Sequence, residues 1–372
     1  MTAEILSDRA LNRATLQRQL LLERAPMPVL DAVEHLVGLQ AQEPNDPYLA
    51  LWSRLDGFRP DDLAHLLVDR KVVRIVVMRG TIHLLTADDC LMLRPLMQPV
   101  LDAEIKRHRD YAPLLDGVDL GPVLAFVRSL VADNPLSGRQ LRAALAERFP
   151  EHHAAALAYA ARCHLPMVQV PPRGVWGRSA QVSTTTAESW LGRPLASAPS
   201  IDAVVMRYLA AFGPATVADV ASWCRLTGLR EVVERLRPRL QTFRDERGRE
   251  LFDVPDSPRA DPDVAVPTRF LPEYDNVLLS HADRSRFLVK NEAERLYSLG
   301  ERAVGAVLHD GLLRATWRLE RDRSSGSAAM VVGYLGCLPD GAGEAIEAEG
   351  RRLLGLVAAD AAESDLRFVA LS

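Results

Sequence analysis

The amino-acid sequence predicts an α+β fold with three tandem winged helix-turn-helix units and a C-terminal α+β region. Short amphipathic helical segments closed by a β-hairpin pattern are the order of a winged helix-turn-helix unit. This order recurs three times along the 372-residue chain, although sequence identity between the units is negligible. A proline-rich segment then leads into a region where alternating strands flank one long helix. The repeat is therefore one of element order and not of sequence.

The first unit, expected at residues 1–112, places four helical segments before its hairpin. Leucines at helical spacing, and prolines that suit first turns, predict these helices. They are expected from Asn12 to about Arg24, from Pro26 to about Gln42, from Asp46 to about Leu55 and from Leu63 to Val68. The next segment, Val72–Thr86, is rich in β-branched residues with Arg79 and Gly80 in its middle, which predicts a hairpin.

The second unit, expected at residues 113–197, and the third, at residues 198–260, follow the same order. Helices are expected at Leu120–Val131, Gly138–Glu147, Ala154–Cys163, Ile201–Phe212, Val217–Cys224 and Leu229–Leu236. Strands are expected at Pro166–Val170, Val175–Ser183, Leu240–Phe243 and Glu250–Val254. Prolines and glycines between these segments supply the turn chemistry that the order needs.

The C-terminal region, expected at residues 261–372, begins in a linker with four prolines between Pro255 and Pro267. Two alternating segments beyond it predict strands around a polar loop. These strands are expected at Ala315–Leu319 and Ala328–Leu335, followed by a helix at Ala342–Ala362 and a strand at Leu366–Leu371. A basic hairpin is therefore expected near the end of the chain.

The composition is that of an ordinary globular protein, with 48% apolar and 25% charged residues and a formal net charge of −4. This balance is not that of a protein coated in basic residues, but a local basic face would still accept nucleic acid. The four cysteines are far apart, so we expect reduced, mostly buried thiols and no metal site. Without a signal-peptide core or a bilayer-length apolar run, the chain is expected to be soluble and cytoplasmic.

A polar corner, Gly38–Tyr48, interrupts the apolar helices of the first unit. Pro44 disfavours helix at the preceding residue, so the helix that carries Gln40 and Gln42 should end there, with Asp46 as the next N-cap. The two amides are too weak to act as bases, but they can hold a water or face a developing charge. The alternative is that they cap the helix and satisfy backbone groups. Glu43 and Asp46 are the nearby carboxylates that would assist electrostatically.

Basic residues in three other segments are candidate contacts to phosphate. Arg79 is expected at the turn of the first hairpin, where a solvated tip is the alternative. The polar segment Leu271–Phe287 resembles an active-site or phosphate-contacting strand and loop, in which a buried Asp275–Arg284 ion pair is the alternative. The candidates from these segments and the last hairpin are Arg79, Arg284, Arg286, Arg318, Arg321 and Arg323. A metal is not expected, because no further ligand completes the spacing of His281 and Asp283.

Three motifs together resemble the AlkZ/YcaQ winged-helix DNA glycosylases over nearly the whole chain. The motifs are Leu-Gln-Ala-Gln-Glu-Pro with its continuation at Leu39–Trp52, Met-Arg-Gly-Thr-Ile-His-Leu at Met78–Leu84, and Leu-Pro-Glu-Tyr-Asp-Asn with its continuation at Leu271–Arg286. The Gln-aliphatic-Gln form is similar to the AlkZ branch, since the YcaQ branch has aspartate where this chain has Gln42. The family's catalytic glutamines map onto Gln40 and Gln42, and its DNA-probing hairpin onto the Arg318–Ser327 region.

The resemblance implies a concave DNA-binding face and a monomeric, monofunctional DNA glycosylase without a cofactor. Its substrates would be bulky N7-alkylated purines and interstrand crosslinks in double-stranded DNA. The AlkZ branch is associated with self-resistance to DNA-alkylating natural products such as azinomycin. Two other functions stay open on the sequence alone. One is a non-catalytic winged-helix DNA-binding regulator, and the other is sequestration of the alkylating compound itself.

Overall fold

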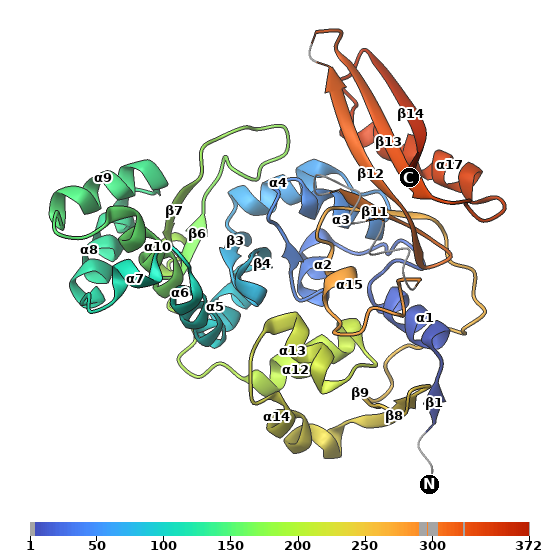
Figure 1. The fold of residues 1–372 in the computed structure, drawn as a ribbon, viewed down its shortest axis with the longest axis horizontal. Coiled ribbons are helices and arrows are strands. Elements are labelled where there is room, and N and C mark those ends of the chain that lie inside the picture. Colours follow the sequence, from blue (N-terminus) through green and yellow to red (C-terminus); the bar gives the residue numbers. More distant parts are fainter. Residues whose placement is uncertain (1–3, 290–295, 297–303, 323, 372) are drawn as a thin grey trace.

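The computed structural model describes residues 4–289, 296, 304–322 and 324–371. Figure 1 shows helices packed around three separate sheets of six, three and five strands. The predicted α+β class is therefore confirmed. In the described part of the chain, no helix is both long and apolar enough to cross a membrane.

The six-stranded sheet joins the first two groups of elements and has the strand order β2-β4-β3-β6-β7-β5. Its strands are β2 (Leu39–Gln40), β3 (Val72–Val76), β4 (Ile82–Thr86), β5 (Leu136–Ser137), β6 (Met167–Gln169) and β7 (Ser183–Thr186). The hairpin strands β3 and β6 pair antiparallel at the centre, through Arg74 with Gln169 and Ile75 with Val168. In the first half of the sheet, β4 lies between β2 and β3, and in the second half β7 lies between β5 and β6. The two halves therefore meet through β3 and β6.

Helices precede and separate these strands in the same order in both halves. The first half contains α1 (Asp8–Arg18), α2 (Val29–His35), α3 (Asp46–Arg54) and α4 (Pro60–Val68), and a 3-10 turn, η1 (Met78–Gly80), joins β3 to β4. The second half contains α8 (Leu120–Asp133), α9 (Gly138–Arg148) and α10 (Ala154–His164), with α11 (Ala187–Leu191) after β7. Ser137 and Gln140 form a reciprocal capping box that fixes the start of α9.

The third group repeats the order around a small sheet. It contains α12 (Ile201–Phe212), α13 (Val217–Cys224), α14 (Leu229–Leu236), η2 (Arg237–Arg239), β8 (Gln241–Asp245) and β9 (Glu250–Asp253), and β1 (Ile5–Leu6) pairs with β8. All three helices have the predicted ranges. The core of this group is continuous with the first hairpin and with α5 (Ala87–Leu96), since Ile75, Leu93 and Trp223 belong to one apolar cluster. The third group is therefore held against the turn of the first hairpin.

The C-terminal region forms the five-stranded sheet β10-β11-β12-β13-β14. Its elements are β10 (Arg269–Leu271), α15 (Asn276–Leu279), β11 (Gly305–His309), β12 (Leu312–Asp322), β13 (Ser327–Leu335), α17 (Ala342–Val357) and β14 (Glu363–Leu371). The predicted hairpin, helix and closing strand are confirmed, with β14 parallel to β13. Figure 1 shows the β12–β13 hairpin standing out from the body, on the same side as the loop between β6 and β7.

Several sequence predictions for single elements are wrong. The Gln40 segment is not helical, because α2 ends at His35 and Gln40 pairs with His83 across β2 and β4. Ser7, and not Asn12, caps α1. The segment predicted as a strand from Val175 is irregular up to residue 182. The helices α5 (Ala87–Leu96), α6 (Gln98–Arg107) and α7 (Ala112–Leu115) were not predicted.

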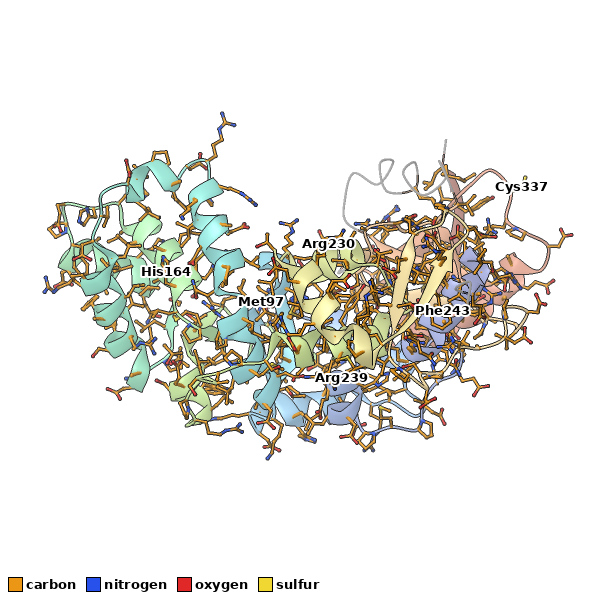
Figure 2. The ribbon with its side chains drawn as sticks, turned by 90° about the horizontal axis from the view of Figure 1, so that it is seen from below. Met97, His164, Arg230, Arg239, Phe243 and Cys337 are labelled. Carbon is orange, nitrogen blue, oxygen red and sulfur yellow. The ribbon has the colours of Figure 1, made fainter. Side chains whose placement is uncertain are left out.

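The free cysteines match the expectation of separate, mostly buried thiols. Cys90, Cys163 and Cys224 are buried. The fourth, Cys337, is exposed in the turn after β13, at the edge of the molecule in Figure 2. Met97, at the junction of α5 and α6 in the same view, is completely buried.

Candidate active site at the glutamine corner

The candidate site begins with a contact network that joins three distant segments of the chain. Arg79 Nη2 donates to Gln40 Oε1 at 2.6 Å and to Asn276 Oδ1 at 2.7 Å. Its Nη1 donates to the carbonyl oxygen of Trp223, at the end of α13, at 3.0 Å. Asn276 in turn donates to the carbonyl oxygen of Gly38 at 3.2 Å. The three sequence motifs therefore converge on one guanidinium group.

Arg79 faces inward because of the geometry of its turn. It has a left-handed backbone with φ of 58°, and Gly80 follows it with φ of 71°. A turn of this kind brings the Arg79 side chain back over the sheet instead of into solvent. The predicted hairpin is confirmed. Arg79 is half-buried, and both of its terminal nitrogens donate to protein acceptors, so its contact with phosphate stays a prediction that these bonds do not favour.

The charge of Arg79 is held entirely by neutral acceptors. Burial, together with the nearby Arg225, lowers its pKa to about 10, so it stays a cation at neutral pH. His83 is fully buried, and burial and Arg79 lower its pKa to about 3, so its ring is neutral. His83 Nδ1 lies 3.1 Å from the carbonyl oxygen of Thr81 and Nε2 lies 3.3 Å from Arg79 Nη2. The proton therefore belongs on Nδ1, and Nε2 is an acceptor for Arg79.

The network sets the orientation of the Gln40 amide. Because Oε1 of Gln40 accepts from Arg79, its amide nitrogen is directed away from the guanidinium. Gln40 is only 7% exposed, whereas Gln42 is exposed. One glutamine is thus fixed inside the protein, and the other reaches into solvent.

A second arginine holds the backbone between the two glutamines. Arg74 Nη2 donates to the carbonyl oxygen of Ala41 at 2.7 Å, and the Ala41 amide donates to the carbonyl oxygen of Ile82 at 2.8 Å. Arg74 is buried, and burial and then Arg173 lower its pKa to about 10. The Gln-Ala-Gln segment is therefore fixed from both sides by the arginines of the first hairpin.

The loop between β6 and β7 covers Arg74. Tyr48 Oη donates to the carbonyl oxygen of Gly174 at 2.8 Å and accepts from the amide of Trp176 at 3.1 Å. Gly174 has φ of 89°, and a Cβ atom there would lie 2.9 Å from Arg74 Cδ. A left-handed glycine is thus required where the loop passes over the guanidinium. The buried Tyr48 side chain therefore fastens the second group of elements to the glutamine corner.

Asp46 differs from its predicted role. It is the first residue of α3, and Asn45 holds the N-cap position without a side-chain hydrogen bond. The Asp46 side chain is 4% exposed, and its Oδ2 has no hydrogen-bond partner among the described residues. Burial, followed by repulsion from Glu273 and Glu43, raises its pKa to about 8. At neutral pH this carboxyl is therefore mostly protonated.

A cavity of about 840 Å³ lies next to this corner. Its walls come from the corner itself, the loop between β6 and β7, and strand β12. Side chains from these walls include Glu43, Asp46, Arg173, Trp176, Trp317 and Arg321. Acidic, basic and aromatic groups thus face one space that is large enough for a small-molecule or nucleotide site, for which volumes of about 300–1,000 Å³ are typical.

The other predicted basic residues fall into different environments. Arg318 and Arg321 line the cavity, and they pair at the surface with Glu320 and Asp360. Arg284 is exposed and lines a smaller neighbouring cavity of about 190 Å³. Arg323 lies outside the described residues.

Arg286 does not have the predicted access to a phosphate. It is buried, and its Nη1 donates to Thr15 Oγ1 at 3.0 Å and to the carbonyl oxygen of Pro214 at 3.2 Å. The ion pair between Asp275 and Arg284, which was the alternative for this segment, does not form either. Asp275 instead receives two hydrogen bonds of 2.8 Å from Arg54, and both side chains are buried. Arg286 and Arg54 therefore stabilise the loops behind the candidate site.

Among the residues that the structure describes, no cluster of three or more His, Cys, Asp or Glu side chains could hold a metal ion. The His281–Asp283 segment is structural, since His281 contacts the carbonyl oxygen of Phe212 and Asp283 pairs with Arg249. The polar side chains of the corner and of the first hairpin include amides, carboxyls and guanidinium groups.

Sequence reasoning missed Arg74, Asn276 and Glu273 as members of the site. Arg74 offered one signal, because an arginine within a run of β-branched residues needs a buried acceptor. Asn276 and Glu273 lie in the Leu-Pro-Glu-Tyr-Asp-Asn motif, but the motif does not show which of its polar residues reach the site. Their partners lie far away along the chain, so local patterns do not identify them.

Comparisons with known proteins identify a family and a similar fold. The model of the family described as "DNA glycosylase AlkZ-like" matches residues 33–356. No curated protein matches the chain. Among solved structures, the DNA glycosylase AlkZ of Streptomyces sahachiroi is similar with a TM-score of 0.71 and 20% identity, over 98% of this chain and 100% of that chain. At this identity the likeness to that structure supports the fold, and the family match reaches all three motifs of the corner.

Proposed function

This chain belongs to the AlkZ-like DNA glycosylase family, and from this premise we propose that it hydrolyses the N-glycosidic bond of bulky N7-alkylated purines and unhooks interstrand crosslinks. The observation that carries the proposal is the convergence of Gln40, Arg79 and Asn276, which orients one amide of the Gln-Ala-Gln segment. Without a lysine in this corner, the attacking group is water, and the enzyme is monofunctional.

The proposed chemistry does not require the protein to supply a general acid. An N7-alkylated purine is cationic, so it takes the electrons of the breaking bond and leaves as a neutral base. The protein has to position water at the sugar and to stabilise its oxocarbenium-like charge. Gln40 and Gln42 orient water and substrate, and Glu43 and Asp46 assist electrostatically. The water adds to the sugar carbon and releases its proton to solvent or to the exposed Glu43.

We propose that double-stranded DNA lies across the three helical groups as a monomeric complex. The side chains that line the cavity on β12, Arg318 and Arg321, contact phosphates or a groove, as does the exposed Arg284. Each group is then one winged-helix unit, with boundaries near residues 112, 197 and 260. Self-resistance to a DNA-alkylating natural product such as azinomycin is the proposed biological role, and the protein acts in the cytoplasm at the nucleoid.

The proposal is tested by incubating the protein with a duplex that contains one bulky N7-alkylguanine. Base release is measured by the free adduct and by strand breakage after alkali. The expected result is release of the adduct with breakage only after alkali, because water is the nucleophile. Breakage without alkali would contradict a monofunctional mechanism, and no release from any N7-alkylated duplex would contradict the proposed substrate class.

A further inference from the structure

We propose that the 840 Å³ cavity beside the glutamine corner is a binding site for a positively charged nucleobase, with the carboxyl groups of Glu43, Asp46 and Glu273 facing its charge. The inference rests on the proposed function for the identity of the ligand as part of a DNA strand. It goes beyond that function by assigning the residues that recognise the charge of the damaged base.

The three carboxyl groups reach this cavity from two separate segments. Glu43 and Asp46 come from the corner that begins α3, and Glu273 comes from the turn between β10 and α15. Among the described residues, none of the three forms a salt bridge, although four arginines line the same cavity. These carboxyl groups are therefore without a direct basic partner among the described residues, and a bound cation would pair with them.

Asp46 supplies an independent sign of a missing partner. Its side chain is 4% exposed, it lines the cavity, and its Oδ2 contacts no hydrogen-bond donor among the described residues. Buried polar atoms in proteins nearly always have a partner, so an orphaned carboxyl oxygen on a residue that lines a cavity points to a ligand. Repulsion from Glu273 and Glu43 also raises the pKa of Asp46, which shows how closely the three groups interact. A cation placed among them would favour the ionised form.

The opposite walls carry complementary groups. Arg173 and Arg178 come from the loop between β6 and β7, and Arg318 and Arg321 come from β12. The flat side chains of Trp176 and Trp317 lie in the same lining. Aromatic faces attract both nucleobases and cations, and arginines bind phosphates. The ligand that fits is therefore positive at its centre and negative on its flanks, as an N7-alkylated purine is within a phosphodiester strand.

The positions of these groups in the chain also place the proposed base-binding site next to the proposed catalytic amide. Gln42 and Glu43 are adjacent in the chain, and both are exposed at the corner. A base held against the carboxyl groups would therefore have its sugar close to the exposed amide. The same negative groups that bind the cationic base would stabilise positive charge on the sugar as the bond breaks.

The test compares two duplexes that differ in one charge. The first contains a single N7-benzyl-2′-deoxy-2′-fluoroguanosine, whose base is cationic and whose glycosidic bond resists cleavage. The second contains 7-benzyl-7-deazaguanosine with the same substitution, which has nearly the same shape and no charge. Dissociation constants are measured for the full-length protein by fluorescence anisotropy. We expect the cationic duplex to bind more tightly by on the order of tenfold.

Two variants locate the source of this preference. Glu273→Gln and Asp46→Asn should each reduce the preference severalfold, and the pair should abolish it. Glu273 is partly exposed, so its variant is expected to fold normally, and Asn is nearly isosteric with the protonated Asp46. Glu231→Gln, which removes an exposed charge from α14, is the matched control and should keep the wild-type preference. Melting temperatures of all variants confirm folding.

Equal binding of the two duplexes by the wild-type protein would overturn the inference, as would a full preference in the double variant. A preference that disappears on adding millimolar Mg²⁺ at constant ionic strength would overturn it too, since the carboxyl groups would then be an inorganic cation site. The proposed function is measured separately, by base release from the unfluorinated duplex. Charge preference without base release would contradict the glycosylase activity and leave the binding site intact.

Discussion

Replacing Arg79 by lysine tests whether a guanidinium fork orients the amide of Gln40 that we propose to be catalytic. Lysine keeps a positive charge, but its single ammonium lacks the planar geometry that reaches Gln40, Asn276 and the carbonyl oxygen of Trp223 at once. In Arg79→Lys, the Gln40 amide is therefore released from its fixed orientation while the net charge of the site is unchanged.

The size of the effect follows from the contacts that are lost. Gln40 is 7% exposed and Asn276 4%, so a loss of Arg79 leaves two nearly buried amide oxygens without their donor. Each unsatisfied group costs about 1–3 kcal/mol, which the side chains would avoid by turning away from their present positions. Loss of one preorganised polar group in an active site lowers kcat by about 10²–10³-fold. Because Arg79 acts through Gln40, we expect a decrease of about 10–100-fold in kcat.

The assay is single-turnover release of the adducted base, with kcat and KM separated by varying the enzyme concentration. Arg79→Lys should lower the rate at saturation and leave KM nearly unchanged, and methylguanidinium should partly restore the rate of Arg79→Ala. Arg225→Ala, which removes an exposed neighbouring charge, is the control and should behave as the wild type. A wild-type rate in Arg79→Lys would refute the reasoning, because charge alone would then be enough.

Three further predictions concern stability and DNA affinity. The pKa of Asp46 is about 8 in the folded state, against an ordinary value of 3.8. Between these two pH values the folded state holds a proton that the unfolded state has lost. The free energy of unfolding therefore falls as the pH rises from about 4 to about 8. Asp46→Asn should therefore increase the free energy of unfolding at pH 8 by at least ~1 kcal/mol and flatten its pH dependence. Urea denaturation at pH 5 and pH 8 measures both effects. An unchanged pH profile would contradict the raised pKa of Asp46. Replacing Arg318 and Arg321 together by alanine should weaken binding to all duplexes and reduce the slope of log affinity against log salt by about one to two, and an unchanged slope would remove both residues from the DNA contact. Tyr48→Phe deletes the bond to the carbonyl oxygen of Gly174 and should cost about 1 kcal/mol of stability, read from the same denaturation curves, and no loss would show that the loop is held by packing alone.

Local signals explain why the helices of the third group were predicted with the right ranges. Ser200 and Thr216 accept hydrogen bonds at the N-termini of α12 and α13, and Gly213 and Gly228 mark breaks between helices. Each of these signals lies within a few residues of the element that it starts or ends. A sequence pattern is sufficient in such cases because no distant partner decides the outcome.

The glutamine corner shows the opposite case. Pro44 and the apolar residues before it predict a helix, but pairing between Gln40 and His83 makes the segment a strand. Arg79 was predicted as an exposed turn residue, although its acceptors lie on segments far apart in the chain. The sequence motifs therefore predict which segments form the candidate site, and tertiary contacts decide which way each side chain faces.

The most direct test of the central claim is base release by Gln40→Ala/Gln42→Ala on a duplex with one N7-alkylguanine, measured beside the affinity for the same duplex. The account predicts that release falls to the uncatalysed rate while the dissociation constant changes by less than about threefold. Release at the wild-type rate by this double variant would contradict the claim that the two amides perform the cleavage.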